Sequence, residues 1–140
     1  MKIAIIGAGN MGSAIAKGIL TAHSEHEVRV SNPSTTKLER LKQEFPNAHI
    51  ATNNLSIVPG ADLIILAVKP WFVADVVREI SEVIDADQQM VASLAGGMSL
   101  DDVASCFTAA GAKVPPLCIV MPNTAIAVGS SMTFIATRNM

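Results

Sequence analysis

KIAIIGAGNMG, residues 2–12, is the stretch of sequence that decides the fold. Lys2–Ile6 is a short, mostly apolar run that predicts a strand, and the small and apolar residues after it recur at helical spacing. Between the two, Gly7, Gly9 and Gly12 fit the pattern G-x-G-x-x-G. This pattern binds the pyrophosphate of a dinucleotide when a strand precedes it and a helix follows it. The stretch therefore predicts a dinucleotide site.

Each glycine in this turn has its own physical reason. Gly7 permits the tight turn, Gly9 lets the backbone approach the pyrophosphate, and Gly12 lets the helix pack closely on the strand. The helix that begins at Asn10 and Met11 offers free N–H groups and the positive end of its dipole to the phosphates. The alternative is a glycine-rich turn with a purely structural role in an α/β protein.

The rest of the chain alternates predicted strands with predicted helices. Further strands are expected at Glu27–Ser31, Ala48–Ala51, Ala61–Val68, Gln89–Leu94, Leu117–Met121 and Met132–Thr137. Helical segments are expected from Asn10 to about Ala22, from Ser34 to Pro46, over Asn53–Val58, from Pro70 and from Ser99. This alternation predicts an α/β, Rossmann-like fold: a mostly parallel sheet with helices on both faces, and a single NAD(P)-binding domain over residues 1–140.

The bulk composition excludes several classes of protein. The chain has 140 residues, 50% of them hydrophobic, and a net charge of −2 without blocks of like charge, so neither nucleic acid nor an anionic membrane is an expected partner. The longest apolar run, Leu63–Val68, is far shorter than the roughly 20 residues of a membrane-spanning helix. Cys106 and Cys118 form no C-x-x-C pair and are expected to be small buried residues of a reduced, cytoplasmic protein. The three histidines are scattered, and no metal site is expected.

The segment after the second predicted strand bears on the choice of cofactor. NAD-binding chains place a carboxylate there to hold the ribose hydroxyls, whereas residues 31–37 contain none. A carboxylate would repel a 2′-phosphate by about 4 kcal/mol at 4 Å and an effective dielectric of 20. Hydrogen bonds can come from Asn32, Ser34, Thr35 and Thr36, and positive charge from Lys37. NADP(H) is therefore expected to be preferred, with NAD(H) possible, although Ser34 is equally a plain helix N-cap.

Other strand ends should lie beside the same ligand, because the carboxyl ends of parallel strands meet at one edge of the sheet. Lys69 follows the fourth strand and lies near the expected nicotinamide ribose, unless it is simply a solvated lysine at a helix start. Ala95 and Gly96 follow the fifth strand and leave room for a flat ring. Asn123 and Thr124 follow the sixth strand, where a substrate would meet the nicotinamide.

Four segments, in this order, resemble the Δ1-pyrroline-5-carboxylate reductases over the whole chain. They are Gly7-x-Gly9-x-Met11-Gly12, Ala67-Val68-Lys69-Pro70, Ala95-Gly96 and Met121-Pro122-Asn123-Thr124. The resemblance implies hydride transfer from NADPH or NADH to the C=N carbon of pyrroline-5-carboxylate, the last step of proline biosynthesis.

The resemblance also implies roles for individual residues. Those expected along the pyrophosphate are Gly9, Asn10, Met11 and Gly12. Those expected at the adenosine ribose, its phosphate or the adenosine side are Asn32, Ser34 and Asn54. Those expected along the ribose and nicotinamide are Ala67, Lys69 and Pro70. Those expected to flank the nicotinamide and substrate are Ala95, Gly96, Asn123 and Thr124, and Thr124 is the candidate for the polar contact with the substrate.

The chain also departs from the family. Ala125 stands where the family has proline, Ser131 where it has glycine, and Ile119 near the place of a basic residue, and these differences affect substrate handling. Family members carry a second, helical domain that forms a homo-oligomer and completes the substrate pocket. That domain is expected to be absent from this chain, so these 140 residues alone are expected to be weak or inactive as a reductase.

Two other functions remain open. One is a related imine or hydroxyacid reductase built on the same N-terminal domain. The other is a non-catalytic NADP-binding or sensing module.

Overall fold

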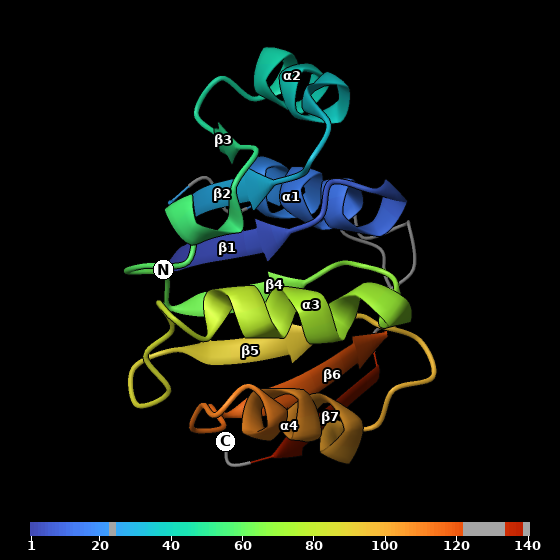
Figure 1. Cartoon of the computed structure of the whole chain (residues 1–140). Helices are drawn as coiled ribbons and strands as arrows, with labels where there is room; N and C mark the ends of the chain where they lie inside the picture. The colour runs from blue at the N-terminus through green and yellow to red at the C-terminus, as the bar shows by residue number, and fades with distance from the viewer. Residues whose placement is uncertain (23–24, 122–133, 139–140) are drawn as a thin grey trace.

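The chain forms one seven-stranded sheet with helices on both of its faces (Figure 1). The computed structural model describes residues 1–22, 25–121 and, for the backbone, 134–138. The strands are β1 Lys2–Ile6, β2 Glu27–Ser31, β3 His49–Ala51, β4 Leu63–Leu66, β5 Met90–Ser93, β6 Leu117–Met121 and β7 Phe134–Arg138. The helices are α1 Asn10–Ala22, α2 Thr35–Glu44, α3 Pro70–Ile80 and α4 Leu100–Ala109, with a 3-10 turn, η1, at Asn54–Ser56.

The strand order is β3-β2-β1-β4-β5-β6-β7. The first six strands are all parallel to one another, and β7 pairs antiparallel with β6. The chain builds from β1 outward to β3, then returns to the other side of β1 and continues through β4, so the order reverses between β1 and β4. This topology confirms the predicted Rossmann-like α/β fold with a mostly parallel sheet.

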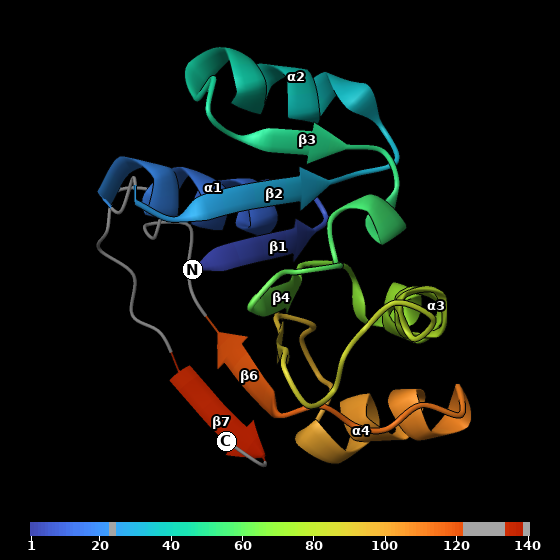
Figure 2. The same cartoon turned by 90° about the vertical axis from the view of Figure 1, so that its left-hand side faces the viewer.

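The central strands β1, β4 and β5 are buried on both faces, and their residues alternate between two apolar cores. In β1, Ile3 and Ile5 belong to the core under α1 and α2, whereas Ala4 and Ile6 belong to the core under α3, η1 and α4. Figure 2 shows α1 on one side of the strands and α3 with α4 on the other. A parallel strand covered on both sides has a continuous apolar sequence, as β1 and β4 have.

The strands begin and end close to their predicted limits, and the differences lie at the ends. The run Ala61–Val68 contains the strand Leu63–Leu66, because Ala61 instead closes a turn by donating its N–H to the carbonyl of Val58. The last predicted strand, Met132–Thr137, is described as Phe134–Arg138. Strand ends of this kind are poorly defined by sequence pattern alone.

The piece predicted as helical at Asn53–Val58 is a single 3-10 turn. Asn53 begins it, and its side-chain oxygen accepts a hydrogen bond from the N–H of Leu55 at 2.7 Å. Ser99 caps α4 as expected, in a capping box with Asp102. Within the described part of the chain, no helix combines the length and the apolar character that crossing a membrane requires.

Candidate functional site

The turn between β1 and α1 is built around a backbone that only glycine adopts easily. Gly7 has φ +109°, and its N–H donates to the carbonyl of Ser31 at 2.8 Å. A Cβ atom on Gly7 would penetrate the carbonyl group of Ala67 at the end of β4. The turn is therefore held between the ends of β2 and β4, with no room for a side chain.

The other two glycines of the motif face different surroundings. A Cβ on Gly12 would overlap the carbonyl oxygen of Gly7 and lie 3.2 Å from the Cβ of Ala67. A Cβ on Gly9 would have no atom within 4 Å. Gly12 thus gives α1 the close packing on the sheet that the motif predicts, whereas Gly9 borders open space.

The N-terminus of α1 points toward that space and carries unused donors. The N–H groups of Gly9, Asn10, Met11 and Gly12 donate to no acceptor among the described residues, and the first backbone bond of the helix runs from Ser13 to Gly9. The first turn contains no acidic residue. Free N–H groups at the positive end of a 13-residue helix form an anion-binding position.

Asn32, directly after β2, is hydrogen-bonded to this turn. Its Oδ1 accepts a hydrogen bond from the N–H of Ala8 at 3.1 Å, and its Nδ2 donates to the carbonyl of Ser34 at 3.0 Å. An aspartate could reproduce the first bond but not the second, since a carboxylate has no donor. Ser34 lies at the N-cap position of α2, as the alternative interpretation expected, but its side chain makes no capping hydrogen bond and is exposed.

Ser31 is the one residue of this corner that sequence reasoning did not single out. It is completely buried, and its hydroxyl donates to Oδ1 of Asn54 at 2.5 Å. Asn54 itself lies in η1, partly exposed. The available signal was a serine at the end of a strand whose apolar residues, Val28 and Val30, are buried, where an unpaired hydroxyl would be costly.

The ends of β4 and β5 form the other half of this edge. Lys69 is exposed at the N-cap of α3, Pro70 occupies the first helical turn, and Ala67 is half-buried. Ala95 is buried, whereas Gly96 is exposed with open space around a would-be Cβ. The two remaining predicted site residues, Asn123 and Thr124, lie outside the described residues.

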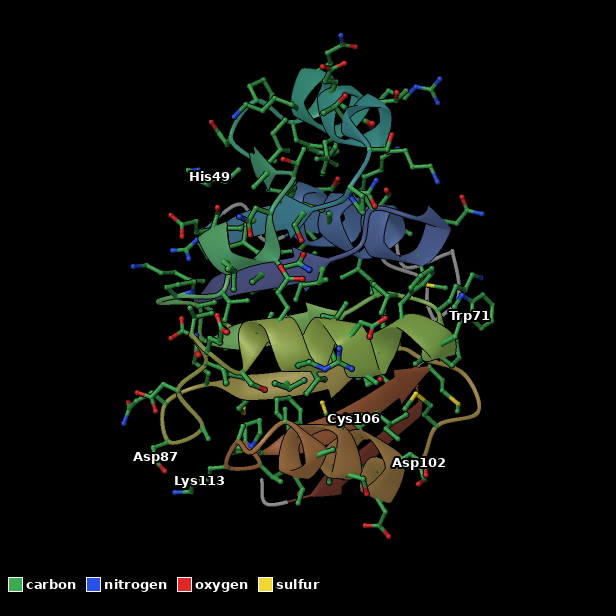
Figure 3. All side chains as sticks on the ribbon, viewed as in Figure 1. His49, Trp71, Asp87, Asp102, Cys106 and Lys113 are labelled. Carbon is green, nitrogen blue, oxygen red and sulfur yellow. The ribbon has the colours of Figure 1, made fainter. Side chains whose placement is uncertain are left out.

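Large apolar side chains are exposed at this same edge. Trp71 is 71% exposed, Phe72 51% and Met121 53%, and the rings of Trp71 and Phe72 lie 6.1 Å apart. Figure 3 places Trp71 at the end toward which the strands point, with His49, Asp87 and Lys113 at the opposite end. The side of the sheet formed by the carboxyl ends of the parallel strands, here called the carboxyl edge, therefore has an anion-binding position beside an apolar surface.

The titratable groups of the described residues offer no competing centre. No group of three metal-ligating side chains occurs among them. Burial raises the pKa of the Cys118 thiol, and burial together with the nearby Asp102 carboxylate raises the pKa of the Cys106 thiol. Cys118 is buried as predicted, whereas Cys106 is only half-buried, because one side of α4 at this point faces a surface groove beside α3.

Comparisons with known proteins agree with this geometry. The sequence profile of a family described as "NADP oxidoreductase coenzyme F420-dependent" matches residues 2–97. The pyrroline-5-carboxylate reductase of Corynebacterium melassecola is 33% identical over 136 residues, which cover 95% of this chain and 48% of that protein. That of Escherichia coli (strain K12) is 32% identical over 136 residues, covering 96% and 48%.

The solved structures give the same result. A pyrroline-5-carboxylate reductase from Coxiella burnetii superposes with a TM-score of 0.87 at 27% identity, covering 98% of this chain and 49% of that one. One from Streptococcus pyogenes superposes with a TM-score of 0.78 at 28% identity, covering 99% and 49%. The chain thus spans about half the length of the relatives it matches.

Proposed function

Because the chain belongs to the family of NADP oxidoreductases described as coenzyme F420-dependent, we propose that its carboxyl edge binds a nicotinamide dinucleotide, NADP(H) in preference to NAD(H). One observation carries the proposal. The donor-bearing N-terminus of α1 and the carboxylate-free end of β2 lie side by side, joined by the hydrogen bond from Ala8 to Asn32. The N-terminus of α1 can bind a pyrophosphate, and the end of β2 has no carboxylate that would repel a 2′-phosphate.

In this proposal the cofactor extends along the edge from β2 to β5. Its pyrophosphate lies over Gly9 and the free N–H groups of α1, and its adenosine end lies by Asn32, Ser34 and Asn54. The nicotinamide half follows the ends of β4 and β5. There Lys69 supplies a donor, and the open space at Gly96 admits a flat ring.

We further propose that the whole protein is a pyrroline-5-carboxylate reductase. When bound, the cofactor supplies the hydride that reduces the C=N bond. The chain's own contribution is to hold the cofactor in place and fix the depth of its ring, with Thr124 as the proposed polar contact at the substrate. Since the chain spans about half the length of its relatives, we expect these 140 residues alone to reduce pyrroline-5-carboxylate slowly or not at all.

The cofactor proposal is tested by titrating the chain with NADPH and NADH and measuring both dissociation constants. The variant Asn32→Asp keeps the acceptor for Ala8 but places a negative charge beside the proposed 2′-phosphate. We expect its NADPH affinity to fall by roughly tenfold or more, with little loss of NADH affinity, because like charges repel strongly at this distance.

The control is Asn47→Asp, which makes the same change of charge in the exposed turn before β3, at the opposite edge of the sheet. It should leave both affinities unchanged. A wild-type chain that binds neither nucleotide would overturn the proposal. Equal losses for NADPH and NADH in Asn32→Asp would show that no 2′-phosphate lies beside Asn32.

A further inference from the structure

Ser31 joins two parts of the carboxyl edge that are distant in sequence. Its carbonyl accepts the N–H of Gly7 in the glycine turn, at 2.8 Å. Its hydroxyl donates to Oδ1 of Asn54 in η1, at 2.5 Å and 23 residues away. The side chain is completely buried, so this hydroxyl has no access to water in place of Asn54.

The bond determines which part of Asn54 is left for a ligand. Oδ1 is occupied by the Ser31 hydroxyl, whereas Nδ2 has no acceptor among the described residues. The asparagine is partly exposed, so its two N–H donors are the groups available to solvent or to a bound molecule. A group that only donates selects a partner rich in oxygen acceptors, such as a ribose hydroxyl or a phosphate.

A second buried serine shows that a serine at the end of a strand does not always form a hydrogen bond with a distant segment. Ser93 closes β5 as Ser31 closes β2, and it is 1% exposed. Within the described part of the chain, however, its hydroxyl bonds only with the N–H of Ala95, two residues away, which it accepts at 3.3 Å. Ser93 supports its own turn, whereas Ser31 reaches across to another segment.

We propose that Ser31 is a positioning residue that fixes Asn54 with its amide donors available to the ribose and phosphate oxygens of the adenosine half of the cofactor. The inference rests on the proposed cofactor site and adds a residue that acts through Asn54 without touching the ligand. Without the hydroxyl, the Asn54 side chain is free to rotate, and part of the binding energy is spent on ordering it again.

The test is a double-mutant cycle read with adenosine 2′,5′-bisphosphate, which contains only the adenosine end, and with NADPH. The variants are Ser31→Ala, Asn54→Ala and the two combined. Ser31→Ala should weaken binding of either ligand by roughly fivefold to tenfold in the wild-type background, the usual size of one lost hydrogen bond. In the Asn54→Ala background the same substitution should change affinity less than about twofold.

Two more variants separate positioning from folding. Ser31→Cys keeps an atom at the γ position, but this larger sulfur is only a weak donor, so the variant should lose about as much affinity as Ser31→Ala, even where the alanine variant is unstable. Ser81→Ala removes a hydroxyl that donates to the carbonyl of Val77 at the far end of α3, and it should bind like the wild type.

Equal losses of affinity in both backgrounds would overturn the inference, since Ser31 would then act on the glycine turn and not through Asn54. Wild-type affinity in Ser31→Ala would overturn it as well. A failure of the cofactor proposal has a different signature: the wild-type chain itself would bind neither ligand.

Discussion

The amino ends of the parallel strands form one side of the sheet, the amino edge, and their carboxyl ends form the carboxyl edge. The two edges are made by the same strands but use their polar groups differently. At the amino edge, buried and partly buried side chains form hydrogen bonds with other parts of the chain. At the carboxyl edge, the glycine turn leaves four backbone N–H groups without an acceptor in the described chain, and Asn54 keeps its amide donors. Hydrogen bonds within the protein contribute to its stability, whereas donors without an acceptor in the protein are available to a ligand.

Gln89, just before β5, shows how the amino edge is closed. It is 4% exposed, and its Nε2 donates to the carbonyls of Val58 and Ala61 at 2.7 and 2.8 Å. Its Oε1 accepts the N–H of Asp85 at 2.8 Å. One side chain thus holds the turn before β4 and the turn before β5 together.

Arg29, in β2 on the other side of β1, has a similar function. It donates to the carbonyls of Ile57 and Pro59 and pairs with Glu27 at 2.8 Å. The amino edge therefore crosslinks loops that the sequence separates by about 30 positions. We expect substitutions there to change stability and not nucleotide affinity, with the opposite result for the open positions of the carboxyl edge.

The largest expected effect comes from two identical substitutions in the glycine turn. Gly12→Ala puts a methyl group into the carbonyl of Gly7, and because backbone cannot move aside cheaply, we expect a loss of about 3 kcal/mol in the free energy of unfolding. Gly9→Ala meets no atom within 4 Å and should fold normally, but its methyl occupies the proposed position of the pyrophosphate.

Urea unfolding and NADPH titration separate the two results. Gly12→Ala should have a reduced unfolding free energy, and Gly9→Ala should have wild-type stability with NADPH affinity lowered by roughly tenfold or more. A Gly9→Ala chain that binds NADPH normally would show that the open space over this turn is not the pyrophosphate position.

A smaller effect, on stability alone, is expected at the amino edge. Gln89→Met keeps the length of the side chain but leaves the buried carbonyl of Ala61 and the N–H of Asp85 without these partners and removes one of the two hydrogen bonds to the carbonyl of Val58, which should cost about 2 kcal/mol of unfolding free energy. The NADPH dissociation constant should not change. The control is Gln88→Met, on the exposed neighbouring residue. A change in NADPH affinity in Gln89→Met would mean that the two edges are coupled and the division between them fails.

The sequence predicts the glycine turn far better than the buried polar side chains of either edge, for a physical reason. The glycine turn is local: Gly7, Gly9 and Gly12 fix one backbone shape within six positions, so a short pattern contains the whole structure. Gln89 and Ser31 depend on partners 23 to 31 positions away, which become neighbours only once the strands have paired. The mostly parallel sheet and the helices on both of its faces were predictable from the alternation of strands and helices, but no pattern in the sequence indicates which buried polar residue contacts which loop.

The smallest expected effect is the contribution of Glu27 to the pH dependence of stability. Its hydrogen bond with Arg29 is the main cause that holds the pKa of this carboxyl below its ordinary value of 4.5, with burial opposing and the charges of Arg29, His49 and Lys2 assisting. A carboxyl whose pKa is lowered by folding stabilises the protein above the ordinary value, and that contribution is lost as the pH falls through the lowered pKa.

Glu27→Gln should therefore be less stable than the wild type at neutral pH, and the two stabilities should converge as the pH falls below 4.5. The difference should be small because the Glu27 side chain is 35% exposed and solvent screens its charge. Thermal unfolding across this pH range measures it, with Glu82→Gln, an exposed glutamate that forms no ion pair with a described residue, as the control. A difference that persisted unchanged into acid would mean that Glu27 stabilises the amino edge by the shape of its hydrogen bond and not by its charge.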